Sequence, residues 1–82
     1  MTPKDCLKAL LQELRRPTYV GRISHPDQLH PDAWTYTRRQ RDPETGVWFR
    51  QFTVYDRKVS ARVYSSKSDT RVLKVQIEED PG

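Results

Sequence analysis

At 82 residues, with 34% hydrophobic and 32% charged side chains, the chain is long enough for one small hydrophobic core and too short for two. Its net charge of +4 favours polyanions or acidic protein surfaces as partners. The sequence has no apolar run of membrane-spanning length and no apolar core of a secretory signal, which argues against membrane and secreted proteins. We therefore expect a single small basic domain over residues 1–82.

The N-terminal residues 1–17 are predicted to form an amphipathic helix. Thr2 can cap its first turn, and Asp5 places an acid where the helix dipole favours one. Arg15 and Arg16 are expected in the last turn, and Pro17 ends the helix. Four leucines share one face at helical spacing: Leu7, Leu10, Leu11 and Leu14. This stripe predicts core packing, with docking into a partner's groove as the alternative.

Residues 18–32 are predicted to form a loop. Tyr19 and Val20 favour a short extra strand over 18–22, before Gly21 bends the chain. The following segment, SHPDQLHPD, contains two prolines and several turn-forming residues. Such a composition is incompatible with a central strand.

Residues 33–78 are predicted to form a four-stranded antiparallel meander, followed by a frayed acidic tail over 79–82. The strands are expected over 33–40, 46–55, 58–65 and 70–78. The first hairpin carries Asp-Pro-Glu-Thr-Gly, in which Gly46 supplies the left-handed position of a bulged turn. The short connections at 56–57 and 66–69 leave room for antiparallel returns alone. The fold class is therefore predicted to be α+β, with one N-terminal helix packed on this sheet.

Side-chain alternation predicts which face of the sheet the helix covers. Two strands each place three apolar residues on one side: Val59, Ala61 and Val63, then Leu73, Val75 and Ile77. We expect the leucine stripe of the helix to pack on this face. The second strand is apolar on both sides, which is typical of a central strand covered on each face.

Positive charge and aromatic rings are interleaved along the predicted sheet. From Arg38 to Lys74 there are ten Lys/Arg residues against four Asp/Glu. Guanidinium groups bind phosphates, and exposed rings stack on unpaired bases. The sequence thus predicts a wet sheet face that binds nucleic acid, DNA or RNA, with Arg39 and Arg41 turned away by strict alternation. The candidate residues are Trp34, Tyr36, Arg38, Arg39, Arg41, Arg50, Arg62, Tyr64 and Lys74.

The same residues also fit two other interpretations. Arg, Tyr and Trp dominate protein interfaces, so the chain could instead be a small inhibitor or modulator, of phage or plasmid type, that docks on the acidic surface of a nucleic-acid-processing protein. A solvated face with cross-strand Arg–aromatic pairs needs no ligand at all. An exposed edge of the meander is compatible with a homodimer.

Two further groups of residues are candidate chemical sites. The doubled His-Pro-Asp at His25 and His30 could serve a metal-independent ribonuclease, but its spacing in a proline-rich loop favours turn chemistry. The single cysteine, Cys6, lies beside Lys8, where a positive field would lower its pKa, yet a small core residue is the simpler interpretation. We expect no enzyme, cofactor or metal site, and a reducing, cytoplasmic location.

Two family resemblances accompany these patterns. The stretch 34–52, with RRQRDPETGVWFRQF, is similar to the arm-binding sheet domains of tyrosine recombinases, in which a hairpin with such a turn enters DNA. A basic four-stranded sheet after a helix is also similar to RelE-type ribonuclease toxins, whose helical hairpin is longer than the single helix predicted here. The first resemblance implies DNA binding, and the second implies RNA cleavage.

Overall fold

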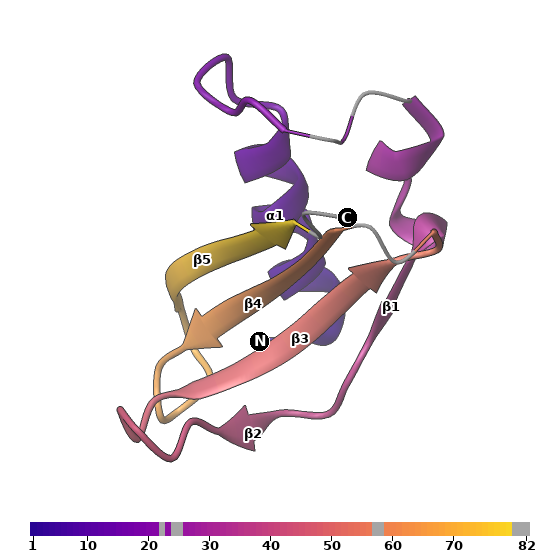
Figure 1. Cartoon of the computed structure of the whole chain (residues 1–82). Helices are drawn as coiled ribbons and strands as arrows, with labels where there is room; N and C mark the ends of the chain where they lie inside the picture. Colours follow the sequence, from indigo (N-terminus) through magenta and orange to yellow (C-terminus); the bar gives the residue numbers. More distant parts are fainter. Residues whose placement is uncertain (22, 24–25, 57–58, 80–82) are drawn as a thin grey trace.

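The computed structural model describes residues 1–21, 23, 26–56 and 59–79, in which one α-helix lies against an antiparallel sheet (Figure 1). The sheet has the order β1-β3-β4-β5, and β2 pairs with β3 beside β1. The predicted α+β fold, with its N-terminal helix, is confirmed. The elements are α1 (Pro3–Leu14), β1 (Trp34–Tyr36), β2 (Gln40–Arg41), β3 (Trp48–Val54), β4 (Val59–Ser65) and β5 (Val72–Glu79).

Helix α1 begins with the predicted cap. The Thr2 hydroxyl accepts a hydrogen bond from the Asp5 backbone N–H at 3.3 Å, and the Thr2 N–H donates to the Asp5 carboxylate at 2.9 Å. Such a cap contributes about 1 kcal/mol to helix stability. The helix ends at Leu14, so Arg15 and Arg16 follow the last turn instead of lying in it.

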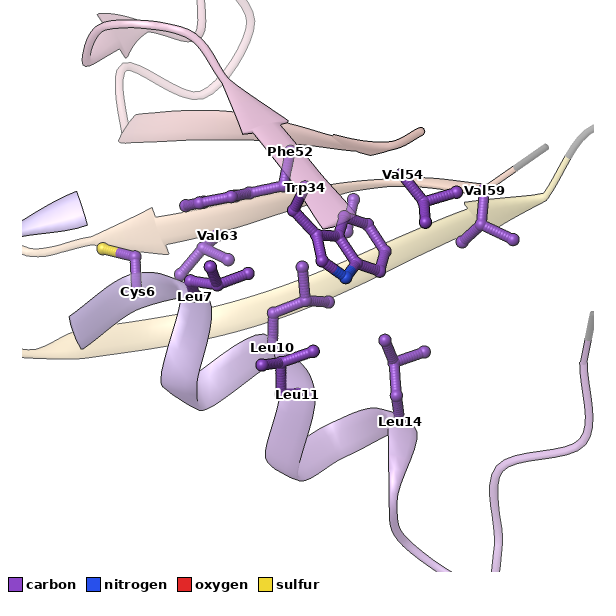
Figure 2. Packing of buried hydrophobic residues seen from close by; sticks show 11 residues of the cluster. Cys6, Leu7, Leu10, Leu11, Leu14, Trp34, Phe52, Val54, Val59 and Val63 are labelled. Atoms are coloured by element: carbon purple, nitrogen blue, oxygen red, sulfur yellow. The ribbon is translucent and has the colours of Figure 1, made fainter. Parts of the chain in front are cut away.

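The leucine stripe packs on the sheet, as predicted (Figure 2). On the sheet side the contact is made by residues of β1, β3 and β4, while Val72, Val75 and Ile77 of β5 pack at its margin. Burying these side chains supplies the main favourable term in folding. The fully or nearly fully buried cluster consists of Cys6, Leu7, Leu10, Leu11, Leu14, Trp34, Phe52, Val54, Val59, Ala61 and Val63.

The β2–β3 hairpin forms around the predicted turn. Gly46 has φ +75°, and its N–H donates to the Asp42 carbonyl at 2.7 Å. The strand predicted over 33–40 is wrong in extent, because residues 37–39 interrupt it between β1 and β2. Here the Arg39 side chain reaches across to the backbone carbonyls of Ser66 and Lys67, which draws the chain out of the ladder.

The pairing of β4 with β5 contains a β-bulge that corrects one face assignment. Tyr64 pairs with Lys74 but Ser65 pairs with Val72, which leaves Leu73 as the extra residue. Leu73 is therefore 48% exposed, and Val72 packs against the core in its place. The predicted core position of Leu73 is wrong, whereas those of Val75 and Ile77 are confirmed.

The segment between the helix and the sheet contains two short 3₁₀ helices, η1 (Pro26–Leu29) and η2 (Pro31–Ala33), that the sequence analysis did not predict. The described residues 18–21 form no strand, and Arg22 lies outside the described residues. Tyr19 instead donates a hydrogen bond to the carboxylate of Glu79. Glu79 belongs to β5 and not to a frayed tail, while 80–82 and the predicted strand position 58 lie outside the described residues.

Among the described residues, none of the helices combines the length and the apolar character needed to cross a bilayer.

Candidate nucleic-acid interface

The nine candidate residues do not share one face of the sheet, so that part of the prediction is wrong. Register places Trp34 opposite Val54, Tyr36 opposite Phe52, and Arg50 opposite Val63, all on the side that carries the core. The other side carries Arg62, Tyr64 and Lys74. Register and alternation together separate the two groups: Arg62 pairs with Gln51, the neighbour of Arg50, and adjacent residues of a strand point to opposite faces.

Trp34 and Tyr36 lie on the helix side at the edge strand. Trp34 is 5% exposed, and its indole N–H donates to the Gln28 carbonyl at 2.7 Å. Tyr36 is 54% exposed, with its ring centroid 5.7 Å from that of Phe52. The buried indole of Trp34 is a core residue and offers no stacking surface to a ligand.

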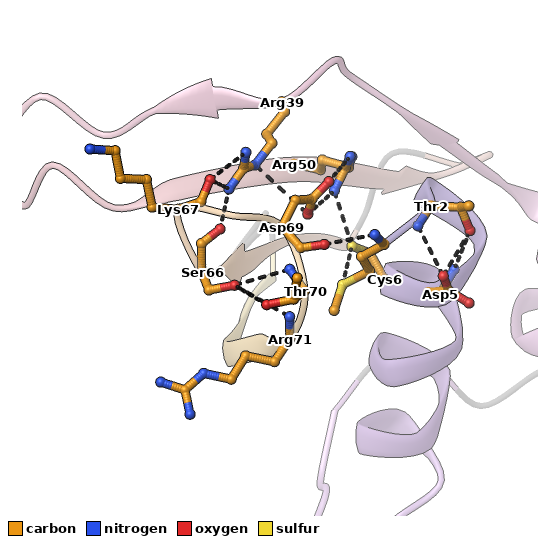
Figure 3. A network of polar contacts seen from close by, with 11 residues as sticks. Thr2, Asp5, Cys6, Arg39, Arg50, Ser66, Lys67, Asp69, Thr70 and Arg71 are labelled. Atoms are coloured by element: carbon orange, nitrogen blue, oxygen red, sulfur yellow. Dashed lines mark hydrogen bonds and ion pairs between the residues drawn. The ribbon is translucent and has the colours of Figure 1, made fainter.

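Arg50 and Arg39 converge on one carboxylate, that of Asp69 (Figure 3). Arg50 is buried and donates two hydrogen bonds to Asp69, at 3.1 and 2.9 Å. Arg39 lies 3.8 Å from the same carboxylate and over the ring of Trp48, at 5.1 Å from its centroid. The hydrogen bonds from Arg50 hold the pKa of Asp69 below its ordinary value, so this carboxylate is ionised and already paired.

The open side of the sheet carries a row of rings covered by cations. Phe49 and Tyr64 have ring centroids 5.4 Å apart, with the Arg62 guanidinium 4.5 Å above Phe49 and the Lys74 ammonium 5.9 Å from Tyr64. Tyr64 is 8% exposed, and its hydroxyl donates to Asp42 at 3.4 Å. The three predicted site residues Arg62, Tyr64 and Lys74 therefore lie together. Their cations and rings contact one another, so the rings are not exposed as stacking surfaces.

A shallow hollow of about 440 Å³ beside this layer is balanced in charge. It is lined by Arg62 and Lys74, but also by Asp42 and Glu44. Hydrogen bonds lower the pKa of Asp42 and keep its carboxylate negative, and the largest effect comes from the backbone N–H of Glu44. An incoming phosphate would therefore meet two carboxylates here, which disfavours this face as an anion site.

A group of exposed cations lies at one end of the sheet, where the β2–β3 hairpin and the β4–β5 turn come together (Figure 1). We call this region, residues 37–50 and 65–71, the hairpin end. It holds six Lys/Arg against three Asp/Glu, a net charge of +3 out of +4 for the whole chain. Exposed cations among them are Arg38, Arg41, Lys67 and Arg71.

A hollow of about 370 Å³ opens at the hairpin end. Arg41 and Lys67 approach it from the hairpin and from the turn, and Trp48 forms part of its wall. None of the described residues that line it carries a carboxylate. Figure 3 shows the Lys67 and Arg71 side chains extending away from the paired network around Asp69. The arrangement offers an anion two exposed cations, Arg41 and Lys67, neither of which is in an ion pair between described residues.

Sequence analysis missed Trp48, Lys67 and Arg71 as members of this site. Their signal was present, because Lys67 and Arg71 flank the β4–β5 turn and Trp48 begins the strand after the hairpin. Turn residues at the same end of an antiparallel meander are close in space whatever their separation along the chain.

The two other chemical sites considered earlier have structural explanations. The Nδ1 of His30 accepts a hydrogen bond from the Asp32 N–H at 3.2 Å and caps η2, while His25 lies outside the described residues. Cys6 is buried, and burial raises the pKa of its thiol despite the Arg50 guanidinium 3.4 Å away. The predicted lowering is therefore wrong, because desolvation outweighs the positive field. The described residues contain no group of three or more His, Cys, Asp or Glu able to hold a metal.

Comparison with known proteins adds no relative: no family model matches the chain, and neither do any curated protein or solved structure.

Proposed function

We propose that this protein is a nucleic-acid-binding module that contacts the phosphates of a duplex with its hairpin end. The observation that carries this proposal is the hollow lined by Arg41, Lys67 and Trp48, whose described lining has no carboxylate. Guanidinium and ammonium groups neutralise phosphates and release the counterions bound to them, which drives association.

The position of Asp69 supports the proposal. The Asp69 carboxylate in the β4–β5 turn is paired with Arg50 and Arg39, so it does not compete for the cations that line the hollow. The ion pairs also fix the β4–β5 turn against β3, which places Lys67 beside the hairpin. A preorganised cation loses less conformational entropy when it binds a phosphate.

The distribution of rings favours a duplex over a single strand. Unpaired bases are bound by stacking on exposed aromatic side chains. Of the rings predicted to do this, Trp34 and Tyr64 are buried, and the exposed Tyr36 lines the groove beside α1 instead of the hairpin end. Trp48, at the hairpin end, is covered by the Arg39 guanidinium. A site that offers cations without bare rings suits the regularly spaced phosphates of a double helix.

A salt titration tests the proposal. With the four exposed cations of the hairpin end each neutralising one phosphate, log affinity for a 20-base-pair duplex should fall with log salt at a slope of about −3 to −4. A single strand of the same length should bind more weakly at each salt concentration. Absence of duplex binding at low salt, or a slope near zero, would refute it.

Two other functions stay predictions. The ribonuclease hypothesis rests on His25 and His30 and is tested by RNA cleavage that His30→Ala abolishes. The protein-binding modulator is favoured by a different observation, a groove beside α1 that the hairpin end does not include.

A further inference from the structure

We infer that the groove between α1 and the edge strand β1 is a docking site for an extended, acidic segment of a partner protein. The groove has a volume of about 680 Å³ and is separate from the hairpin end. Its floor is apolar, formed by Leu7, Leu11 and Trp34, and the exposed ring of Tyr36 borders it. The inference does not depend on the proposed nucleic-acid binding.

The charge of the groove selects an acidic occupant. Lys4 and Lys8 line it from α1 and Arg15 from the C-cap of that helix, against one described carboxylate, Asp32. All three cations are exposed, and Lys4 and Lys8, four residues apart, lie on the same side of α1. An apolar floor between cations suits a segment with apolar and acidic side chains on one face, whereas a nucleic-acid backbone would leave the floor uncovered.

The backbone of β1 selects an extended occupant. The Tyr55 N–H donates to the Ala33 carbonyl, and the Thr37 N–H donates to the Gln51 carbonyl at 2.9 Å, so residues 33 and 37 point their backbone groups toward β3. Backbone groups alternate in direction along an antiparallel strand, which turns those of Tyr36 to the outer edge of β1. No described strand pairs with that edge.

The groove beside α1 and the unpaired outer edge of β1 adjoin each other. Trp34 and Tyr36 point their side chains to the helix side, so a strand added outside β1 would place every second side chain toward α1. The side chains of the added strand would contact the apolar floor formed by the helix leucines, and the lysines of the helix. Addition of a strand to a free edge supplies backbone hydrogen bonds, and the side-chain positions supply specificity.

The test uses the whole protein and a designed probe. The probe is a blocked heptapeptide with glutamate, valine and glutamate at its second, fourth and sixth positions and threonine elsewhere, so that the acidic and apolar side chains share one face. The control peptide has lysine in place of glutamate. Binding is followed by ¹H–¹⁵N NMR titration and by amide hydrogen exchange.

The inference predicts saturable shifts at Leu7, Leu11 and Tyr36. Exchange of the Tyr36 amide should slow on binding, while that of Thr37, already bonded to Gln51, should not change. The double variant Lys4→Gln/Lys8→Gln should bind about fivefold more weakly, because exposed ion pairs contribute modestly. Arg16→Gln, which removes one charge outside the groove, should bind as the unaltered protein does.

Three results would overturn the inference. The first is equal binding of the glutamate and lysine peptides, and the second is peptide-induced shifts centred on Arg41 and Lys67 in place of the groove. The third is an unchanged affinity in Lys4→Gln/Lys8→Gln when its NMR spectrum shows that the variant is folded.

Discussion

The Arg50 guanidinium meets the Asp69 carboxylate at 2.9 Å on the helix side of the sheet, joining the central strand to the β4–β5 turn. The pair is nearly buried, and Cys6 and Arg39 lie against it. The same contact that removes Arg50 from the candidate surface thus holds the turn that presents Lys67.

Replacing Asp69 by asparagine should destabilise the protein by about 2–3 kcal/mol, because it leaves a buried guanidinium without its counter-charge. Asparagine suits the position, since residue 69 has φ +58° and asparagine tolerates that conformation. Urea unfolding measures the change. Glu44→Gln, which neutralises an exposed carboxylate in the hairpin, should change stability by less than about 0.5 kcal/mol. Equal effects of the two variants would contradict the role assigned to Asp69.

The same ion pair predicts a loss of stability in acid. The folded-state pKa of Asp69 is lowered below its ordinary value of 3.8, chiefly by the hydrogen bonds from Arg50. Its contribution is therefore complete above the unfolded pKa and is lost as the pH falls through the folded one. As the pH falls below about 4, Asp69→Asn should lose less stability than the unaltered protein does. Asp5 and Asp42, whose pKa values are also lowered, leave a residual acid dependence in both proteins.

Two leucine-to-alanine substitutions test the corrected face of β5. Leu10 is fully buried and should cost about 3 kcal/mol when truncated, because the change leaves a cavity in the core. Leu73, at the bulge, should cost about 0.5 kcal/mol. Chemical denaturation of the two variants compares them directly. A cost for Leu73→Ala close to that for Leu10→Ala would restore the original core assignment.

Gly46→Ala should destabilise the hairpin by about 1–2 kcal/mol, since its φ of +75° is unfavourable for a residue with a Cβ. The added methyl meets only the flexible end of Arg41, at 3.2 Å, so the cost is one of backbone conformation. Gly46→Asn should cost less, because asparagine adopts this region more readily. Thermal unfolding of both variants tests whether Gly46→Ala is the more destabilising of the two.

Much of the fold follows from local patterns in the sequence. The helix, its Thr2 cap and the Gly46 turn depend on neighbouring residues, so the leucine spacing, the capping residues and the turn residues predict them. The bulge at Leu73 and the interruption of the first strand arise from tertiary contacts, such as that of Arg39 with the β4–β5 turn. Single-sequence patterns carry no record of these contacts.

The candidate site was less predictable for a different reason. Arg50 lies two residues before Phe52, so alternation alone assigns it to the core side. Because Arg50 is charged, it was assigned to the solvent-exposed face. Its ion-pair partner Asp69, which permits its burial, lies 19 residues away in sequence. Arg62, Tyr64 and Lys74 were grouped correctly because they share a face by register.

The measurement that tests the central claim most directly is the salt dependence of duplex binding by Arg41→Gln/Lys67→Gln. If these side chains contact phosphates, the slope of log affinity against log salt should become shallower by about 1.8, or 0.9 for each lost contact. Arg16→Gln, which removes one charge outside the hairpin end, should leave the slope unchanged. A double variant with the slope of the unaltered protein would contradict phosphate binding at the hairpin end.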